Sequence, residues 1–279
     1  MLPAAFGGKR GQRASDQFRI QYMSDLHLER IKYDYDVQPV APYLLLAGDI
    51  GNFYAYEQFR DFLARQCQQF KKVFLVAGNH EFYRTSREEG LQAAGKLVQD
   101  PALDGKLVFL HRGRFDVPDS DVTLLGCTLH SYIAPDYTKL TNDFQYIKGW
   151  RVRDHNAEHE RDLQWLQDSL AQLSRENPRR KVVIATHYAP AFEKTCHPMN
   201  ENNEISQCFS SHALQALKGW QGADLVTHWL FGHTHWNTKF RSGSTLVLSN
   251  QRCNSDRTLS WWQKHTIYRP FDPEAVIEL

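Results

Sequence analysis

The chain has 279 residues, of which 42% are hydrophobic, and its formal net charge is +1. This apolar content is enough to bury a full core, and the near-neutral charge excludes the strong basic field of a dedicated nucleic-acid binder. Its five cysteines include no CxxC pair, which argues against a disulfide framework, and no stretch reaches the roughly 18 apolar residues of a membrane span. We therefore expect a cytoplasmic protein that is not bound to a membrane.

The order of the apolar segments predicts an α/β fold. Residues 1–17 are rich in Gly, Arg and Ser and are expected to form a flexible tail. Strands are predicted at 18–24, 43–48, 72–78, 106–111, 121–130, 181–187, 224–232 and 244–250. Helices are predicted at 55–70, 86–99 and 213–220. Because no linker or repeat interrupts this alternation, residues 18–279 are expected to form a single domain.

The strongest helix pattern lies between residues 153 and 178. Its apolar stripe consists of Leu163, Leu166, Leu170 and Leu173. Asp154 or Asn156 is the expected N-terminal cap, and the Asn177–Pro178 pair is expected to end the helix.

Polar residues that can bind a metal stand where the apolar strands end. These residues are Asp25, His27, Asp49, Asn79, His80, His187, His233 and His235, and they follow five different strands. Sites in open α/β sheets form at the carboxyl ends of strands, so these side chains are expected to converge. The sequence therefore predicts one site built from segments that lie far apart in the chain.

The spacing and type of these residues favour a metal centre with two ions. Residues two apart in an extended segment point the same way, so Asp25 and His27 face one side together, as do His233 and His235. The Asp49 carboxylate can bridge two cations. Oxygen and imidazole ligands without a thiolate suit Mn, Fe, Zn, Ni or Co. Two such ions about 3.5–4 Å apart form the clamp that is used for in-line displacement at phosphorus.

The ordered motifs DxH, GD, GNH, a lone His and GHxH resemble the calcineurin-like metallophosphoesterase superfamily, over about residues 18 to 250. The stretches GNHEFY and SNQR are similar to those of a small eukaryotic branch of predicted phosphoesterases. The resemblance implies a four-layer α/β/β/α sandwich with two mixed sheets and a site at the strand ends. No position of the motif set departs from the pattern.

The resemblance also implies a role for each motif residue. One metal would be held by Asp25, His27, Asp49 and His235. The other would be held by Asp49, Asn79, His187 and His233. His80 would face the substrate, stabilise charge on the phosphoryl oxygens and protonate the leaving group. A hydroxide that bridges the two ions would be the nucleophile.

Several residues outside the motifs are candidates for substrate contact. His130 is the last residue of the predicted strand 121–130, Arg84 follows the GNH motif, and Arg252 follows the last predicted strand. An arginine fork matches a phosphate, but a solvated surface position is the simpler interpretation for each arginine. Glu81 is either a residue that orients a ligand histidine or a solvated residue at a strand end.

Two long polar stretches, 131–153 and 189–211, are either lids over the site or surface excursions.

The leading functional hypothesis is hydrolysis of a small phosphomonoester or phosphodiester by a dinuclear metal site. His130 and the aromatic stretch 131–150 keep open an alternative, in which the same site hydrolyses an amide, ester or lactone. A third hypothesis is a scaffold that binds partner proteins, and the complete ligand set argues against it. The sequence predicts no oligomeric state.

Overall fold

The computed structural model describes residues 18–201 and 203–279, so the predicted tail at 1–17 lies outside the described residues. The strands are β1 Arg19–Met23, β2 Tyr43–Ala47, β3 Lys72–Val76, β4 Leu107–Phe109, β5 Gly113–Asp116, β6 Val122–Cys127, β7 Lys181–Thr186, β8 Val226–Phe231, β9 Lys239–Ser242, β10 Thr245–Ser249 and β11 Val276–Glu278. The helices are α1 Tyr56–Gln69, α2 Arg87–Gln99, α3 Asp143–Tyr146, α4 Val152–Glu176, α5 Ala213–Leu217 and α6 Trp261–Thr266. Short 3-10 turns join several of them.

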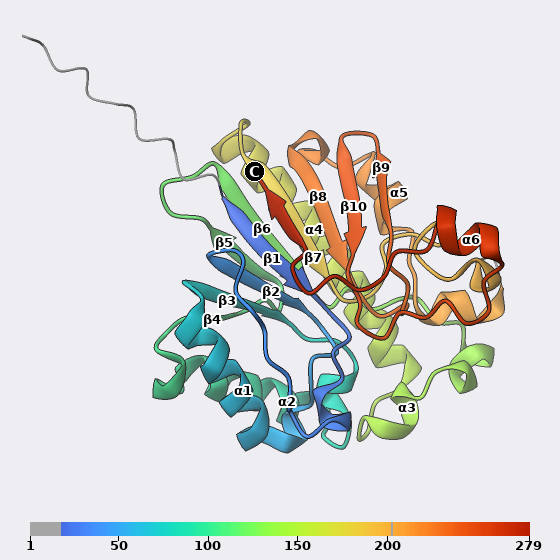
Figure 1. The fold of residues 1–279 in the computed structure, drawn as a ribbon. Helices are drawn as coiled ribbons and strands as arrows, with labels where there is room; N and C mark the ends of the chain where they lie inside the picture. The colour runs from blue at the N-terminus through green and yellow to red at the C-terminus, as the bar shows by residue number, and fades with distance from the viewer. Residues whose placement is uncertain (1–17, 202) are drawn as a thin grey trace, which may run out of the picture.

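The strands form two mixed sheets (Figure 1). The first has the order β11-β1-β2-β3-β4 and is parallel except for the antiparallel edge strand β11. The second has the order β5-β6-β7-β8-β10-β9, with a parallel centre and antiparallel strands at both edges. The parallel strands point their carboxyl ends in one direction within each sheet. The predicted α/β class with two mixed sheets is confirmed.

Both faces of the central strands are buried, which explains their continuous apolar runs. In β2, Leu44 and Leu46 pack with the residues of α1 and α2, whereas Leu45 and Ala47 pack in a second cluster. That second cluster joins the two sheets, since it also contains Val183 of β7 and other strand residues of the second sheet. A third cluster lies between the second sheet and helices α4 and α5. The chain is thus layered as helix, sheet, sheet and helix.

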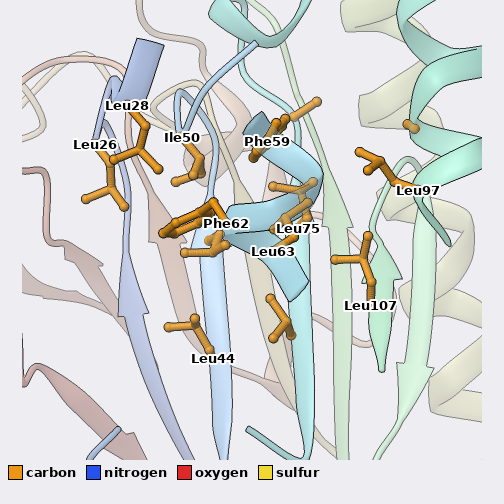
Figure 2. Packing of buried hydrophobic residues seen from close by; sticks show 14 of the residues in the cluster. Leu26, Leu28, Leu44, Ile50, Phe59, Phe62, Leu63, Leu75, Leu97 and Leu107 are labelled. Carbon is orange, nitrogen blue, oxygen red and sulfur yellow. The ribbon is translucent and has the colours of Figure 1, made fainter. Parts of the chain in front are cut away.

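The cluster between the first sheet and its helices fixes the position of α1. Figure 2 shows Phe59, Phe62 and Leu63 of this helix packed over Leu44 and Leu75 of the strands. The three helix residues have the spacing of one helical face, and all three are fully buried.

Several elements of the structure differ from the predicted ones, and helix α5 ends at Leu217, three residues short of its predicted end. Strands β5, β9 and β11 and helices α3 and α6 were not predicted. Helix α4 begins at Val152 with Arg151 at its N-cap, so the predicted cap by Asp154 or Asn156 is wrong, although Asn177 ends the helix as expected. Strand β6 ends at Cys127, three residues short of the predicted end. Strand β8 begins at Val226, after a short 3-10 turn.

Among the helices that the structure describes, none is long and apolar enough to cross a membrane.

Candidate metal centre

Eight motif residues gather at the carboxyl ends of strands from both sheets. They follow β1 (Asp25 and His27), β2 (Asp49), β3 (Asn79 and His80), β7 (His187) and β8 (His233 and His235). Five of the eight have a positive φ, between 46° and 72°, namely Asp25, His27, Asp49, His233 and His235. Left-handed backbone at a residue other than glycine costs on the order of 1–3 kcal/mol and persists where the surrounding structure enforces it. The strand ends are therefore bent to aim these side chains at one place.

One half of the centre is formed around His187. Its Nε2 lies 3.1 Å from Asn79 Oδ1, 3.1 Å from His233 Nδ1 and 3.3 Å from Asp49 Oδ1. Gly78 makes this approach possible, because a Cβ at that position would lie 2.6 Å from His187 Nε2 and would clash with Asp49 Oδ1. Asp49, His187 and His233 form one group that could hold a metal ion.

The other half is formed around His27. Its Nε2 lies 3.2 Å from His235 Nε2 and 3.9 Å from Asp49 Oδ2, and His235 Nε2 lies 3.4 Å from Asp25 Oδ1. Asp25 is held in place by the Ser24 hydroxyl, which donates to its Oδ2 at 2.6 Å. Asp25, His27 and Asp49 form a second group that could hold a metal ion, and it shares Asp49 with the first.

The hydrogen bonds of the imidazoles show which nitrogen faces the centre. His187 Nδ1 lies 3.0 Å from the Ala47 carbonyl oxygen, and His233 Nε2 lies 3.3 Å from the Cys208 carbonyl oxygen. A carbonyl only accepts, so each of these nitrogens carries a proton and the other nitrogen is the one directed at the centre. A bound cation would take its ligand from that second nitrogen of each ring.

The two central carboxylates are ionised although they are buried. Burial by itself would raise the pKa of Asp49, but the imidazoles of His187 and His80 hold it well below its usual range. Burial would raise the pKa of Asp25, but the hydrogen bond to His235 together with the charges of His235 and His187 lowers it overall. Two buried negative groups with converging imidazoles are the donor set that divalent or trivalent cations require.

His80 lies beside the centre and has a carboxylate partner. Glu29 Oε1 lies 3.0 Å from His80 Nδ1, and His80 Nε2 lies 4.0 Å from Asp49 Oδ2. Burial lowers the pKa of His80, but the charges of Asp49 and Glu29 raise it above its usual value overall. The His80 ring therefore presents Nε2 toward the centre while Glu29 fixes its orientation. The sequence analysis missed Glu29, which lies two residues after His27.

Glu81 is buried and braces the loop that carries Asp49. Its carboxylate accepts hydrogen bonds from the backbone N–H groups of Gly78 (2.7 Å), Asp49 (3.0 Å) and Ile50 (2.8 Å). Neither sequence interpretation was right, because Glu81 contacts backbone amides instead of a histidine and is 0% exposed. Burial, followed by the charge of Asp49, raises the pKa of Glu81 to about 7.

Two further residues at the centre escaped the sequence analysis. Asp143, at the start of α3, accepts a hydrogen bond of 2.8 Å from the Asn79 amide nitrogen. Cys253, just after Arg252, places its Sγ within 4.8 Å of ligand nitrogens of His27 and His235. Neither residue belongs to a recognisable motif, so only the folded arrangement reveals them.

The three candidates for substrate contact have different surroundings. His130 is buried and stacks on Tyr188, with ring centroids 5.5 Å apart, and Tyr188 in turn packs against His233. Arg84 is exposed and lies over the Tyr54 ring. Arg252 donates to the Leu26 carbonyl at 3.1 Å. Arg252 is thus the one of the three anchored to the loop between Asp25 and His27.

Comparison with known proteins identifies the class to which this centre belongs. The chain matches the family described as calcineurin-like phosphoesterase over residues 18–237. It therefore belongs to the calcineurin-like phosphoesterase family and is a metal-dependent hydrolase. The family typically binds a dinuclear metal site, and the clustered His and Asp residues fit that expectation.

Individual relatives are distant. The chain is 25% identical to "Uncharacterized protein L509" of Acanthamoeba polyphaga mimivirus over 263 residues, which is 83% of this chain and 90% of the viral protein. It is similar in structure to phosphopantetheinyl hydrolase of Mycobacterium tuberculosis, with 14% identity, a TM-score of 0.65 and coverage of 95% of this chain and 97% of that one. A dimetal phosphatase of Danio rerio has 15% identity and a TM-score of 0.52, with 83% and 86% covered. At these identities the two structures support the fold alone.

Proposed function

We propose that the chain hydrolyses a small phosphomonoester or phosphodiester with the help of two metal ions. The observation that carries this proposal is the position of Asp49, whose two carboxylate oxygens face different imidazoles, His187 at 3.3 Å and His27 at 3.9 Å. One ion would be held by Asp25, His27, Asp49 and His235. The other would be held by Asp49, Asn79, His187 and His233.

The donor set suits Mn, Fe or Zn, and also Ni or Co. When bound, the ions would lower the pKa of a water molecule and neutralise charge on the phosphoryl oxygens. The contribution of the chain itself is a fixed geometry, since strained backbone and buried hydrogen bonds hold the ligands before any ion binds.

His80 would donate a proton to the leaving group. Its raised pKa keeps the imidazole protonated to higher pH, and Glu29 holds the ring by its Nδ1 so that Nε2 stays available. Arg252, anchored on the Leu26 carbonyl, would neutralise a phosphate that approaches from that side.

The substrate would be a small molecule, handled in the cytoplasm, without nucleic acid or membrane as partner. Hydrolysis of an amide, ester or lactone was kept open by His130 and the aromatic stretch 131–150. The His130 ring packs against Tyr188, Trp150 and His155 and lies 3.4 Å from Asp162, and none of these four residues is a proposed metal ligand. The structure therefore offers no observation that favours this alternative over a phosphate ester.

Turnover of two generic substrates tests the proposal. Protein stripped of metal and resupplied with Mn²⁺ should hydrolyse an aryl phosphomonoester or an aryl phosphodiester. Asp49→Asn should lower this activity at least about 100-fold, because it weakens both ions at once. Asp136→Asn, a change at an exposed acid of the 131–153 stretch, is the matched control and should leave turnover unchanged. Absence of metal-dependent turnover of both esters by the natural chain would contradict the proposal.

A further inference from the structure

A buried carboxylate on α3 receives three side-chain hydrogen bonds beside the metal centre. Asp143 is 1% exposed, and its Oδ1 accepts from the Asn79 amide nitrogen at 2.8 Å and from the Tyr83 hydroxyl at 2.9 Å. Its Oδ2 accepts from the Tyr188 hydroxyl at 2.9 Å. Asn79 and Tyr83 lie in the segment that follows β3 of the first sheet, and Tyr188 follows β7 of the second, so one carboxylate links segments from both sheets to the 131–153 stretch.

Each partner of Asp143 is itself in contact with the centre. Asn79 points its Oδ1 to within 3.1 Å of His187 Nε2. The Tyr83 ring packs on the His80 ring with centroids 4.2 Å apart, and the Tyr188 ring packs on the His233 ring with centroids 4.0 Å apart. Asp143 therefore supports the half of the centre that is formed around His187, and it supports His80 as well.

The chemistry of the amide group makes the Asn79 contact directional. An asparagine side chain has one accepting oxygen and one donating nitrogen, and rotation by a half-turn exchanges them. Asp143 Oδ1 accepts from both the Asn79 amide nitrogen and the Tyr83 hydroxyl, so it favours the orientation of Asn79 in which the nitrogen faces it. The oxygen of Asn79 then faces His187 and the proposed metal.

We propose that Asp143 is a positioning residue for metal binding. It holds Asn79 in the orientation that ligates the ion on the His187 side, called the second ion below, and it fixes two tyrosines against His80 and His233. Within the 131–153 stretch, Asp143 is then the residue that reaches the metal centre. This inference rests on the proposed function, because it assigns Asn79 to a metal.

Mn²⁺ titration of metal-stripped protein tests the inference by calorimetry and metal analysis. The Asp143→Asn side chain has nearly the same volume, but it can donate a hydrogen bond from its own amide nitrogen. Asn79 can accept that bond only if it turns its oxygen toward residue 143 and away from the metal. The affinity for the second Mn²⁺ should fall about 10- to 100-fold, while the affinity for the first changes little. Asp136→Asn is the matched control and should bind both ions as the natural chain does.

Two outcomes separate this inference from the proposed function. If the natural chain fails to bind two Mn²⁺ ions, the proposed function fails first. If the natural chain binds two ions and Asp143→Asn binds both with unchanged affinity, only the role of Asp143 is overturned.

A second variant covers the case in which Asp143→Asn does not fold. Tyr188→Phe keeps the ring and removes the hydroxyl that donates to Asp143 Oδ2, and it leaves in place the Tyr83 hydroxyl, which itself accepts from the Asn79 amide nitrogen at 3.0 Å. It should weaken the binding of the Mn²⁺ ion at Asn79 several-fold, and unchanged binding of both ions would overturn the role assigned to Asp143.

Discussion

At the scale of single residues, the metal centre depends on side chains that do not face a substrate. They hydrogen-bond to backbone groups or to other side chains and so hold the ligands in place. Glu81 satisfies the backbone N–H groups around Asp49, and Asp143 orients Asn79. In each case the residue fixes a group that could otherwise take more than one orientation. Such supporting contacts determine how well a metal site is formed before the ion arrives.

Replacing Glu81 with Gln should destabilise the fold. The amide nitrogen of Gln would face a backbone N–H group that Glu81 now satisfies, such as that of Gly78, and leave a buried donor without a partner. The free energy of unfolding should fall by about 1–3 kcal/mol, as measured by urea denaturation of the metal-free protein. Glu88→Gln, at an exposed position of α2, should have almost no effect. If Glu81→Gln and Glu88→Gln have the same free energy of unfolding, Glu81 does not stabilise the loop around Asp49.

The motif residues could be predicted from the sequence, whereas their supports could not. Asp25, Asp49 and the others follow recognisable apolar strands at short, fixed offsets. Asp143 stands in a polar and aromatic stretch without a motif, and its partners Asn79, Tyr83 and Tyr188 lie 64, 60 and 45 residues away in sequence. Contacts at such separations are set by tertiary packing and leave no local pattern.

At the scale of elements, the sequence predicted central strands well and edge strands poorly. Strands β2, β3 and β7 are buried on both faces and read as continuous apolar runs. Strands β5 and β9 alternate between half-buried and exposed residues, and their sequences, GRFD and KFRS, contain few apolar side chains. Their strand conformation comes from antiparallel pairing with β6 and β10, which no local pattern shows.

Helix α4 is joined to the turn between β4 and β5 by an ion pair whose contribution to stability depends on pH. Arg112 donates to Glu158 at 2.9 Å. Burial alone would raise the pKa of Glu158, but the hydrogen bond and charge of Arg112 lower it to about 2. Because the pKa of Glu158 is lower in the folded state than in the unfolded state, the ion pair stabilises the fold above about pH 4.5. This contribution is lost as the pH falls toward 2.

Glu158→Gln should therefore flatten the acid side of the stability profile. Between pH 5 and pH 3 the natural chain should lose about 1 kcal/mol more unfolding free energy than the variant, after allowance for solvent screening. Urea denaturation at both pH values measures this difference. If the natural chain and the variant lose the same unfolding free energy between pH 5 and pH 3, the ion pair contributes nothing to stability.

At the scale of the whole molecule, the two sheets share one apolar interior. Ile20, Leu45 and Phe74 of the first sheet pack in the same cluster as Leu124 and Val183 of the second. Neither sheet can bury its inner face without the other, and the metal centre takes residues from both. We propose that residues 18–279 form a single domain for this reason.

Calorimetric unfolding tests the proposed single domain. The shared interior predicts one transition in which the calorimetric and van't Hoff enthalpies agree. Two separate transitions would show that the sheets unfold as independent units.

We propose that Asp49 would bridge the two metal ions, and electron paramagnetic resonance of the Mn²⁺-loaded protein tests this proposal most directly. We expect two Mn²⁺ ions per chain with the spectrum of an exchange-coupled pair, and loss of that coupling in Asp49→Asn. Asp136→Asn should keep the coupled spectrum. A spectrum of isolated Mn²⁺ ions in the fully loaded natural chain would contradict the account.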